Sequence, residues 1–251
     1  MLKKRTKARK TKTLEPQQER SRESLQKLLR AAIEVLGQHG VEGTTIPRIA
    51  DHAGLTPGSV YRRFHDKEAL LETAILGLLE RQDEVLRATT TPEIAREIPL
   101  RVFTEQMVNS IVVSYRARAP LLRAIRQFVR GRGRTGFYKK ASRLEIQTSE
   151  QLINLFLTHR ERIKHPDPRA AVAMALMIVT STAFELIVEH QDLSDWKHIL
   201  PVNDDHALKA ELTRAFLSYL GVQELSGEAG KIEAEQMAAA KRWRERTSQN
   251  V

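Results

Sequence analysis

Residues 44–64 constrain the fold more than any other part of the sequence, because they encode two short helices joined by a glycine turn. Thr45 and Thr56 are natural N-caps, and each is followed by a proline in the first turn, where a missing N–H has no partner to lose. Gly54 lies between the helices, where a helix ends in the left-handed conformation that glycine adopts with little strain. With Val60 as an apolar plug on the second helix, this spacing predicts a helix-turn-helix.

The second short helix carries many hydrogen-bond donors on the face opposite its apolar plug. Ser59, Tyr61, Arg62 and Arg63 all fall there within five residues. Hydroxyl and guanidinium groups at this density are typical of a helix that contacts DNA.

From Ser24 to Leu71 the sequence resembles the DNA-binding domain of the TetR family of bacterial transcriptional regulators. The helix LLRAAIEVLGQHG, the link VEGTT, the two short helices and the exit GSVYRRFHDKEALL stand in the order and spacing of that family. The resemblance covers roughly a fifth of the chain. It implies a three-helix DNA-binding domain whose second short helix enters the major groove.

The resemblance also implies which side chains contact DNA. Phosphate contacts are expected mostly from Thr45, Tyr61 and Lys67. Contacts to base edges are expected from Arg48, Thr56, Ser59, Arg62 and Arg63. For Arg62 and Arg63, phosphate contact alone stays an alternative. Pro57 and Gly58 stand where some family members carry contacting side chains, so the bases read there are left open.

Positive charge is concentrated at the amino end of the chain. The protein has 41 basic and 31 acidic residues, a net charge of +10, and seven of the basic residues occur in the first twelve positions. Low hydrophobicity and like charge predict a disordered arm over residues 1–20, either a solvated tail or an arm that binds phosphates or the minor groove. No apolar segment follows it, which argues against a secretory signal. The absence of cysteine suits a reducing cytoplasm.

The rest of the chain keeps a helical pattern without sustained alternation of period two, which predicts an all-α fold. A first helix is expected from Ser21 or Ser24 to His39, where Gly40 stops it. Asp66 can cap a connector helix that runs to about Arg87. Further helices are expected over residues 92–98, 100–116, 120–130, 137–158, 167–189 and 204–220. The expected domains are residues 21–67 for DNA binding and 68–221 for effector binding and dimerisation, followed by a tail over 222–251 with a candidate helix at 228–246.

Residues 170–188 are apolar over a length that raises the question of a membrane span. Glu185 inside this segment, its many small residues, and Arg169 and Glu189 at its flanks argue against one. A helix that is apolar nearly all round must be buried by something. Together with residues 204–220 it resembles the helix pair that forms the four-helix dimer interface of the family. We therefore expect a homodimer and no membrane contact.

A run of basic residues without acidic neighbours lies between Glu105 and Glu145. Arginine dominates this run, and its planar guanidinium binds phosphate or carboxylate well. Most of these side chains are expected on a solvated face. One hypothesis for the others is an anionic effector or an acidic partner near the loop at residues 131–136. Candidate effector-binding residues are Arg130, Arg132 and Arg134, together with Phe103, Met107, Phe128 and Phe137, which alternatively only fill the core.

The sequence offers no candidate for catalysis, and we predict that the protein is not an enzyme. GRGRTG at residues 131–136 matches G-x-G-x-x-G, but an amphipathic helix precedes it where a dinucleotide site needs a strand, so we expect an interhelical loop. Glu185, Glu189 and His190 could gather a metal, although solvated side chains are the more common outcome. Because no Walker loop, nucleophile elbow or H-E-x-x-H occurs, we expect neither metal nor cofactor.

The family resemblance therefore implies a sequence-specific transcriptional regulator that binds double-stranded DNA in the cytoplasm, at the nucleoid. The expected form is a repressor that binds a palindromic operator as a homodimer. Its DNA binding is expected to respond to a small-molecule effector of unknown identity. The alternative is a basic nucleoid-associated protein that binds DNA without sequence specificity and has no effector.

Overall fold

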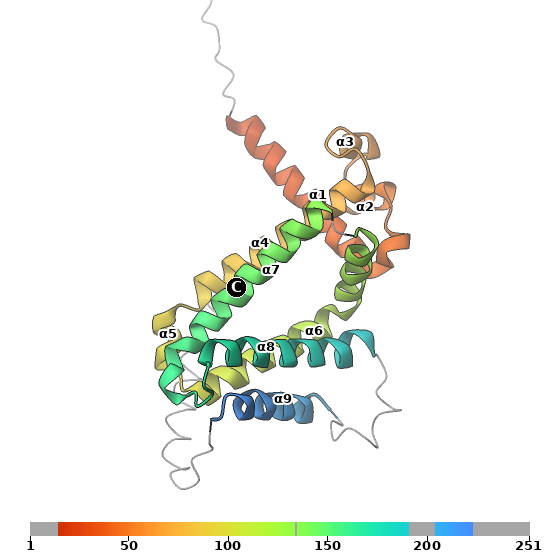
Figure 1. Cartoon of the computed structure of the whole chain (residues 1–251). Helices are drawn as coiled ribbons and strands as arrows, with labels where there is room; N and C mark the ends of the chain where they lie inside the picture. Colours follow the sequence, from red (N-terminus) through yellow and green to blue (C-terminus); the bar gives the residue numbers. More distant parts are fainter. Residues whose placement is uncertain (1–14, 134, 191–203, 223–251) are drawn as a thin grey trace, which may run out of the picture.

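The computed structural model describes residues 15–133, 135–190 and 204–222, which form helices and connecting turns with no strand among them (Figure 1). The all-α prediction is confirmed for these residues. The predicted tail helix at 228–246 lies outside them. The elements are α1 (Glu15–Gly43), α2 (Ile46–His52), α3 (Pro57–Tyr61), α4 (Lys67–Thr89), α5 (Pro92–Glu97), α6 (Leu100–Gly131), α7 (Gly136–Phe156), the 3₁₀-helix η1 (Leu157–Arg162), α8 (Pro168–Phe184), the π-helix η2 (Glu185–Glu189) and α9 (Asp205–Tyr219).

Local capping sets the start of most of these helices. In each of seven helices a Thr or Asp side chain accepts a hydrogen bond from the backbone N–H three residues later. Four of the seven also carry a proline in the first turn. The starts predicted from such residues are therefore confirmed. The caps are Thr45, Thr56, Asp66, Thr91, Thr135, Asp167 and Asp204.

Helix α1 begins earlier than predicted. It starts at Glu15, so residues 15–20, which were expected in a disordered arm, are helical. Good helix formers such as Gln, Glu and Arg precede Ser21, and they extend the helix past the serine that could have capped it. The predicted stop at Gly40 is confirmed, because this residue has a φ of 65° and only a short turn follows it.

Helix α6 is continuous, and the predicted break between two helices at residues 100–116 and 120–130 is wrong. Pro120 lies inside it. A proline inside a helix removes one hydrogen bond and costs about 3 kcal/mol. Both flanks are anchored by burial, with Val112 in one hydrophobic core and Ala124 in another, which offsets this cost. Figure 1 shows that the second half of α6 turns away from the line of the first.

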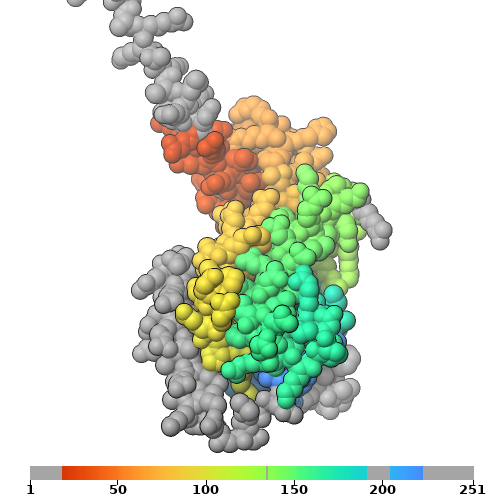
Figure 2. All heavy atoms as spheres, turned by 60° about the vertical axis from the view of Figure 1, so that its left-hand side comes forward, coloured from red at the N-terminus to blue at the C-terminus, as the bar shows by residue number. Residues whose placement is uncertain are grey.

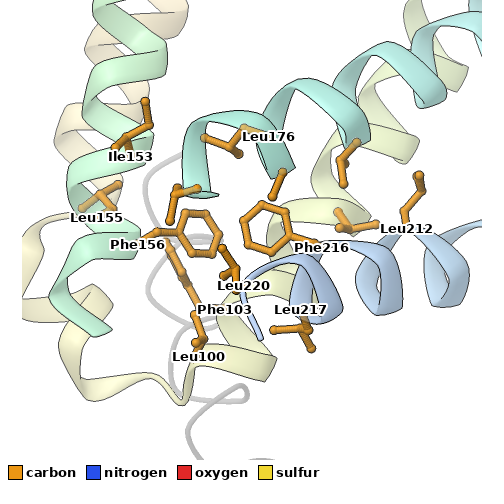
Figure 3. Packing of buried hydrophobic residues seen from close by; sticks show 14 of the residues in the cluster. Leu100, Phe103, Ile153, Leu155, Phe156, Leu176, Leu212, Phe216, Leu217 and Leu220 are labelled. Atoms are coloured by element: carbon orange, nitrogen blue, oxygen red, sulfur yellow. The ribbon is translucent and has the colours of Figure 1, made fainter. Parts of the chain in front are cut away.

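The described part of the chain contains two hydrophobic cores. The larger core is built from residues of the helices from α5 through α9. Aromatic rings from α6, α7 and α9 meet there, with centroid distances of 4.7 Å for Phe103–Phe156 and 4.8 Å for Phe156–Phe216 (Figure 3). The smaller core is built mainly from residues of the helices α1, α2, α3 and α4. The end of α6 and the start of α7 complete it with Ala124, Phe128, Phe137 and Ala141.

A buried carboxylate links the connector helix α4 to α7. Asp83 accepts hydrogen bonds from Arg87 Nε at 2.8 Å, Thr148 Oγ1 at 3.1 Å and Gln147 Nε2 at 3.3 Å. The hydrogen bond from Arg87, more than any other contact, holds the pKa of Asp83 below its ordinary value. The three partners let this charge stay inside the protein, and they fix α4 against α7.

Candidate DNA-binding surface

The α2–α3 pair has the geometry that its sequence predicts. Gly54 turns the chain with a φ of +63°, and its N–H donates to Asp51 O at 2.9 Å. Leu55 N–H donates to Ala50 O at 2.8 Å, which closes the turn. Ala50 and Val60 are fully buried where the two helices meet. Burial of these two side chains fixes the inner face of the helix-turn-helix, and its other face is exposed to solvent.

The outward face carries the predicted DNA-binding side chains. Tyr61 is 56% exposed, and the guanidinium of Arg62 makes no hydrogen bond or ion pair with any residue that the structure describes. Thr45 and Thr56 are exposed at the amino ends of α2 and α3, and Ser59 is half-buried, with its hydroxyl donating to Thr56 O at 2.7 Å. Tyr61 and Arg62 are therefore the side chains of this face with the most freedom to meet a ligand.

Three of the predicted cations have partners within the protein. Arg48 donates to Gly43 O. Lys67 Nζ lies 3.2 Å from Val41 O and is half-buried. Arg63 donates to two serine hydroxyls of α1, to Ser24 Oγ at 3.4 Å and Ser21 Oγ at 3.5 Å. Sequence reasoning missed the partners of Lys67 and Arg63 because these bonds join segments that only the folded domain brings together.

The candidate effector-binding residues do not form one site. Phe103 and Met107 belong to the larger core. Phe128 and Phe137 belong to the smaller one, where their rings meet edge to face at 5.8 Å. Arg132 lies 2.6 Å from Glu72 of α4, and Arg130 is exposed. Arg134 lies outside the described residues.

Other arginines of the basic run also have partners. Arg116 pairs with Asp205 at 2.9 Å, Arg126 with Glu189 at 3.0 Å, and Arg123 donates to Val188 O. These bonds hold α6 against α9 and against the π-helix η2. The run therefore divides into side chains that join helices and a remainder that is solvent-exposed, namely Arg118, Arg130, Lys139, Lys140 and Arg143.

An open groove of about 990 Å³ lies between α6 and α9. Its lining includes the polar side chains of Arg101, Gln106, Asn109 and Lys209, and none of the residues proposed for effector binding lines it. Both amide atoms of Gln106 are buried without a hydrogen-bond partner among the described residues. An unpaired buried amide costs about 1–3 kcal/mol, which a bound polar group would recover. No sequence motif indicated this groove.

Glu185, Glu189 and His190, which the sequence left open as a less favoured metal site, do not come together as a group of three. His190 Nε2 lies 3.1 Å from Glu185 Oε1, while Glu189 pairs with Arg126 instead. Among the described residues no three His, Asp or Glu side chains gather in a way that could hold a metal ion. The loop at residues 131–136 joins α6 to α7, as its sequence predicts.

Helices α8 and α9 expose an apolar face. Met177 is 62% exposed, Met174 45%, Tyr219 39% and Ile178 38%. Within the described residues, the segment Pro168–Glu189 has the length and mean hydropathy, 2.1, that a membrane span needs. Core helices meet the same two criteria, and the opposite face of this one, with Val172 and Val179, is packed in the larger core.

Comparison with known proteins agrees with the geometry of the amino-terminal domain. Residues 28–74 match the family model described as "Bacterial regulatory proteins, tetR family". The chain is similar to the HTH-type transcriptional regulator TtgR of Pseudomonas putida, with 29% identity over 98 residues, which is 37% of this chain and 47% of TtgR. It is 33% identical over 69 residues to the HTH-type transcriptional repressor KstR2 of Mycolicibacterium smegmatis, or 26% of this chain and 34% of KstR2. The chain thus spans about half the length of these curated relatives or less.

A solved structure shares the fold over most of the chain. The transcriptional regulator FadR from Bacillus subtilis, in complex with stearoyl-CoA, superimposes with a TM-score of 0.56 at 15% sequence identity. The match covers 79% of this chain and 99% of FadR. The likeness extends well beyond residues 28–74 and includes the larger helical domain.

Proposed function

We propose that this chain, whose residues 28–74 match the model of the tetR family of bacterial regulatory proteins, is a sequence-specific DNA-binding transcriptional regulator. The observation that carries the proposal is the exposed face around Tyr61 and Arg62 on a capped helix-turn-helix. The names of the relatives, a transcriptional regulator and a transcriptional repressor, support the same role. A protein with this role acts on the chromosome in the bacterial cytoplasm.

The proposed complex has α3 in the major groove. Arg62 is the first candidate for base recognition, because its guanidinium, which has no partner among the described residues, can pair with O6 and N7 of a guanine. Thr45, Tyr61 and Lys67 are proposed to bind phosphates and fix the position of α3. Thr56 and Ser59 are proposed at base edges near the amino end of the helix.

Arg48 and Arg63 are proposed as DNA contacts that first give up bonds within the protein. The bonds of Arg63 to Ser21 and Ser24 are long and exposed. Such bonds contribute about 0.5–1.5 kcal/mol each, and a charge-assisted contact to phosphate or guanine offsets their loss. These two arginines are therefore expected to reorient when DNA binds, whereas Arg62 is already available.

A homodimer is proposed through the apolar face of α8 and α9. Met174, Met177 and Ile178 share one exposed face of α8, Tyr219 is exposed on α9, and exposed apolar side chains that gather in this way are typical of an association site. A second copy placed by a two-fold axis would cover the patch with the same patch. Two α3 helices related by that axis would contact two half-sites of a palindromic operator.

Repression that responds to a ligand is proposed to depend on α6. This helix belongs to both hydrophobic cores, so a change in the larger domain moves the support of the helix-turn-helix. A ligand shifts DNA binding only if its affinity differs between the two arrangements. FadR, which has the same fold, was solved with stearoyl-CoA, and this supports a small-molecule effector.

An anionic effector is the more specific proposal, supported by the exposed cations near the α6–α7 loop. Replacement of Arg130, Arg132 and Arg134 by Ser should weaken the response of operator binding to an anionic probe such as stearoyl-CoA. Arg132 also pairs with Glu72, so Glu72→Gln is the matched control, which removes the same ion pair and keeps all three arginines. An unchanged response in the triple variant would exclude these arginines.

A basic protein that binds DNA without sequence specificity is the competing proposal, supported by the net charge of +10. Selection of bound duplexes from a random pool separates the two. A regulator should enrich a palindrome that it binds at least about a thousandfold more tightly than bulk DNA. Recovery of unrelated sequences without enrichment would overturn the proposed function.

A further inference from the structure

The groove between α6 and α9 lies at the end of the molecule away from the helix-turn-helix. Figures 1 and 2 show this from two sides, with α9 in blue at the opposite end from the red and orange amino-terminal domain. In Figure 1, α6 and α9 run side by side in opposite directions, and Arg116 of α6 pairs with Asp205 at the start of α9, at 2.9 Å. A ligand in this groove therefore leaves the proposed DNA-binding surface accessible.

The turn after α9 brings an aliphatic side chain to one end of the groove. Gly221 has a φ of 69°, and its N–H donates to Ser218 O at 3.0 Å. The N–H of Val222 donates to Leu217 O at 3.1 Å, so the chain folds back over the last turn of α9. Val102, near the start of α6, lines the groove together with Leu217 and Val222. This end of the groove therefore offers a surface for a short aliphatic chain.

Gln106 supplies an unpaired amide to the groove. It is one of the lining residues, and its Nε2 and Oε1 atoms are buried with no hydrogen-bond partner among the described residues. A primary amide donates through its nitrogen and accepts through its oxygen. The group that satisfies both atoms at once presents an acceptor and a donor side by side, and another amide is the simplest group of this kind.

The groove also carries one uncompensated positive charge. Two of its three basic side chains are paired within their own helix, Arg101 with Glu105 at 3.0 Å and Arg214 with Glu211. The third, Lys209, is half-buried and makes no hydrogen bond or ion pair with any residue that the structure describes. Three basic side chains against two carboxylates favour a ligand with a single negative charge, and an ammonium group binds a carboxylate well.

The antiparallel course of the helices sets the order of these groups along the groove. Gln106 lies ten residues before Arg116 on α6, about 15 Å of helix. On α9, Lys209 lies four residues after Asp205, about 6 Å, and Leu217 twelve residues after it, about 18 Å. Because Arg116 and Asp205 are in contact, Gln106 falls between Lys209 and Leu217 along the groove. The groove thus presents a cation, an amide and an aliphatic surface in that order.

We propose that this groove binds a small carboxylate that carries an amide and then an aliphatic chain. This is the chemistry of an N-acylated amino acid or of the carboxyl end of a short peptide. The carboxylate pairs with Lys209, the amide pairs with Gln106, and the aliphatic part lies against Leu217 and Val222. The volume of about 990 Å³ falls within the range of about 300–1,000 Å³ for small-molecule pockets.

An effect of this ligand on DNA binding rests on the proposed function. Helix α6 carries Gln106 in the groove and also contributes Phe128 to the smaller core, which supports the helix-turn-helix. Occupation of the groove changes operator binding only if the ligand has different affinities for the DNA-bound and the free arrangement. The first test is therefore binding of the ligand to the full chain without DNA.

N-hexanoylglycine is the probe, because its carboxylate, amide and aliphatic chain follow one another in the required order. Calorimetry with the full chain should give an affinity in the millimolar range or tighter. Nonanoate has a chain of the same length without the amide, and N-hexanoylglycinamide lacks the charge. Leucylglycine, which adds a free ammonium group, distinguishes a peptide end from an acylated amino acid, and binding of either one supports the site.

Two substitutions assign the contacts. Gln106→Met should weaken the binding of N-hexanoylglycine by about threefold to tenfold without weakening that of nonanoate, because only the first ligand has an amide. Lys209→Met should weaken both carboxylates by at least about tenfold and leave N-hexanoylglycinamide unchanged. Lys140→Met is the matched control, since Lys140 is exposed on α7 and does not line the groove.

The stability of the ligand-free variant shows whether the amide of Gln106 has a structural role instead. Because its polar atoms are buried without partners, Gln106→Met should keep or raise the midpoint of unfolding in urea. The proposal is overturned by a lower midpoint, by equal losses for N-hexanoylglycine and nonanoate in this variant, or by no binding of N-hexanoylglycine and leucylglycine at millimolar concentration. These measurements use no DNA, so they decide on the groove even if no operator is enriched, which is the outcome that removes the proposed function.

Discussion

A Cβ atom placed on Gly37 would lie 3.2 Å from the Cβ atom of Leu121, where α1 crosses α6. This close approach brings the first helix of the DNA-binding domain against the second half of α6. Real Cβ contacts are seldom so short, so the crossing depends on the missing side chain.

Gly37→Val should destabilise the protein by about 1–3 kcal/mol through overpacking, measured as the free energy of unfolding in urea. In the double variant Gly37→Val/Leu121→Ala, the smaller side chain at position 121 makes room for the added methyl groups. Gly37→Val should therefore cost less unfolding free energy in the Leu121→Ala background than in the wild type. Strict additivity of the two changes would contradict the proposed contact, because residues that touch are coupled.

Arg62→Ala should weaken operator binding by about 1–3 kcal/mol at one base pair, because its guanidinium is exposed and can pair with a base. Competition with operators substituted at each position measures the loss. Tyr61→Phe serves as the comparison, since loss of a proposed phosphate contact should weaken all duplexes by a similar factor. A uniform loss for Arg62→Ala would assign this arginine to the phosphates.

Met177→Asp should shift the protein from dimer to monomer in sedimentation experiments at micromolar concentration. A two-fold interface would bury two carboxylates without partners, at a cost of several kcal/mol. Ile146→Asp is the matched control, because Ile146 of α7 is equally exposed, at 60%, but lies outside the α8–α9 face. Dimers that persist in the Met177 variant would place the interface elsewhere.

His159 predicts a specific acid sensitivity. Its ring is buried, Nε2 lies 3.0 Å from Ala95 O, and burial is the largest influence that lowers its pKa below 6.5. The carbonyl of Ala95 raises the pKa in part, while the charges of Arg162 and Arg96 lower it. The unfolded chain therefore takes up the proton first as the pH falls below 6.5, so stability is lost in that direction.

His159→Gln keeps a donor for the Ala95 carbonyl and removes the titration. Between about pH 7 and pH 5, its unfolding free energy should fall less steeply than that of the wild type. The difference between the two proteins cancels the contribution of the carboxylates. Parallel curves would show that the imidazole is not protonated on unfolding.

The helix starts could be predicted because each depends only on the capping residue and the three residues that follow it. Thr45, Thr56 and Asp66 each cap the helix that follows, and no distant contact is needed to satisfy the exposed N–H groups. Gly54 turns the chain for an equally local reason. The exposed face of α3 follows from these signals and from Val60, which fixes the side that is buried.

What could not be predicted depends on contacts between distant segments. Pro120 ends a helix by its local preference, yet burial of Val112 and Ala124 on its two sides keeps α6 continuous. Phe103 and Phe128 are indistinguishable as core residues in the sequence, and only the fold, which places both on α6, assigns them to different cores. The roles of Arg63 and Arg132 likewise depend on partners 39 and 60 residues away.

The smaller core includes Ala124, Phe128, Phe137 and Ala141, which come from the end of α6 and the start of α7. A fragment cut after the helix-turn-helix would expose the apolar surfaces that these four side chains cover. A chimaera that transplants this operator-binding module onto another sensor should therefore carry the end of α6 and the start of α7 with it. The boundaries of such a transplanted segment have to follow the smaller core, whose members are not contiguous in the sequence.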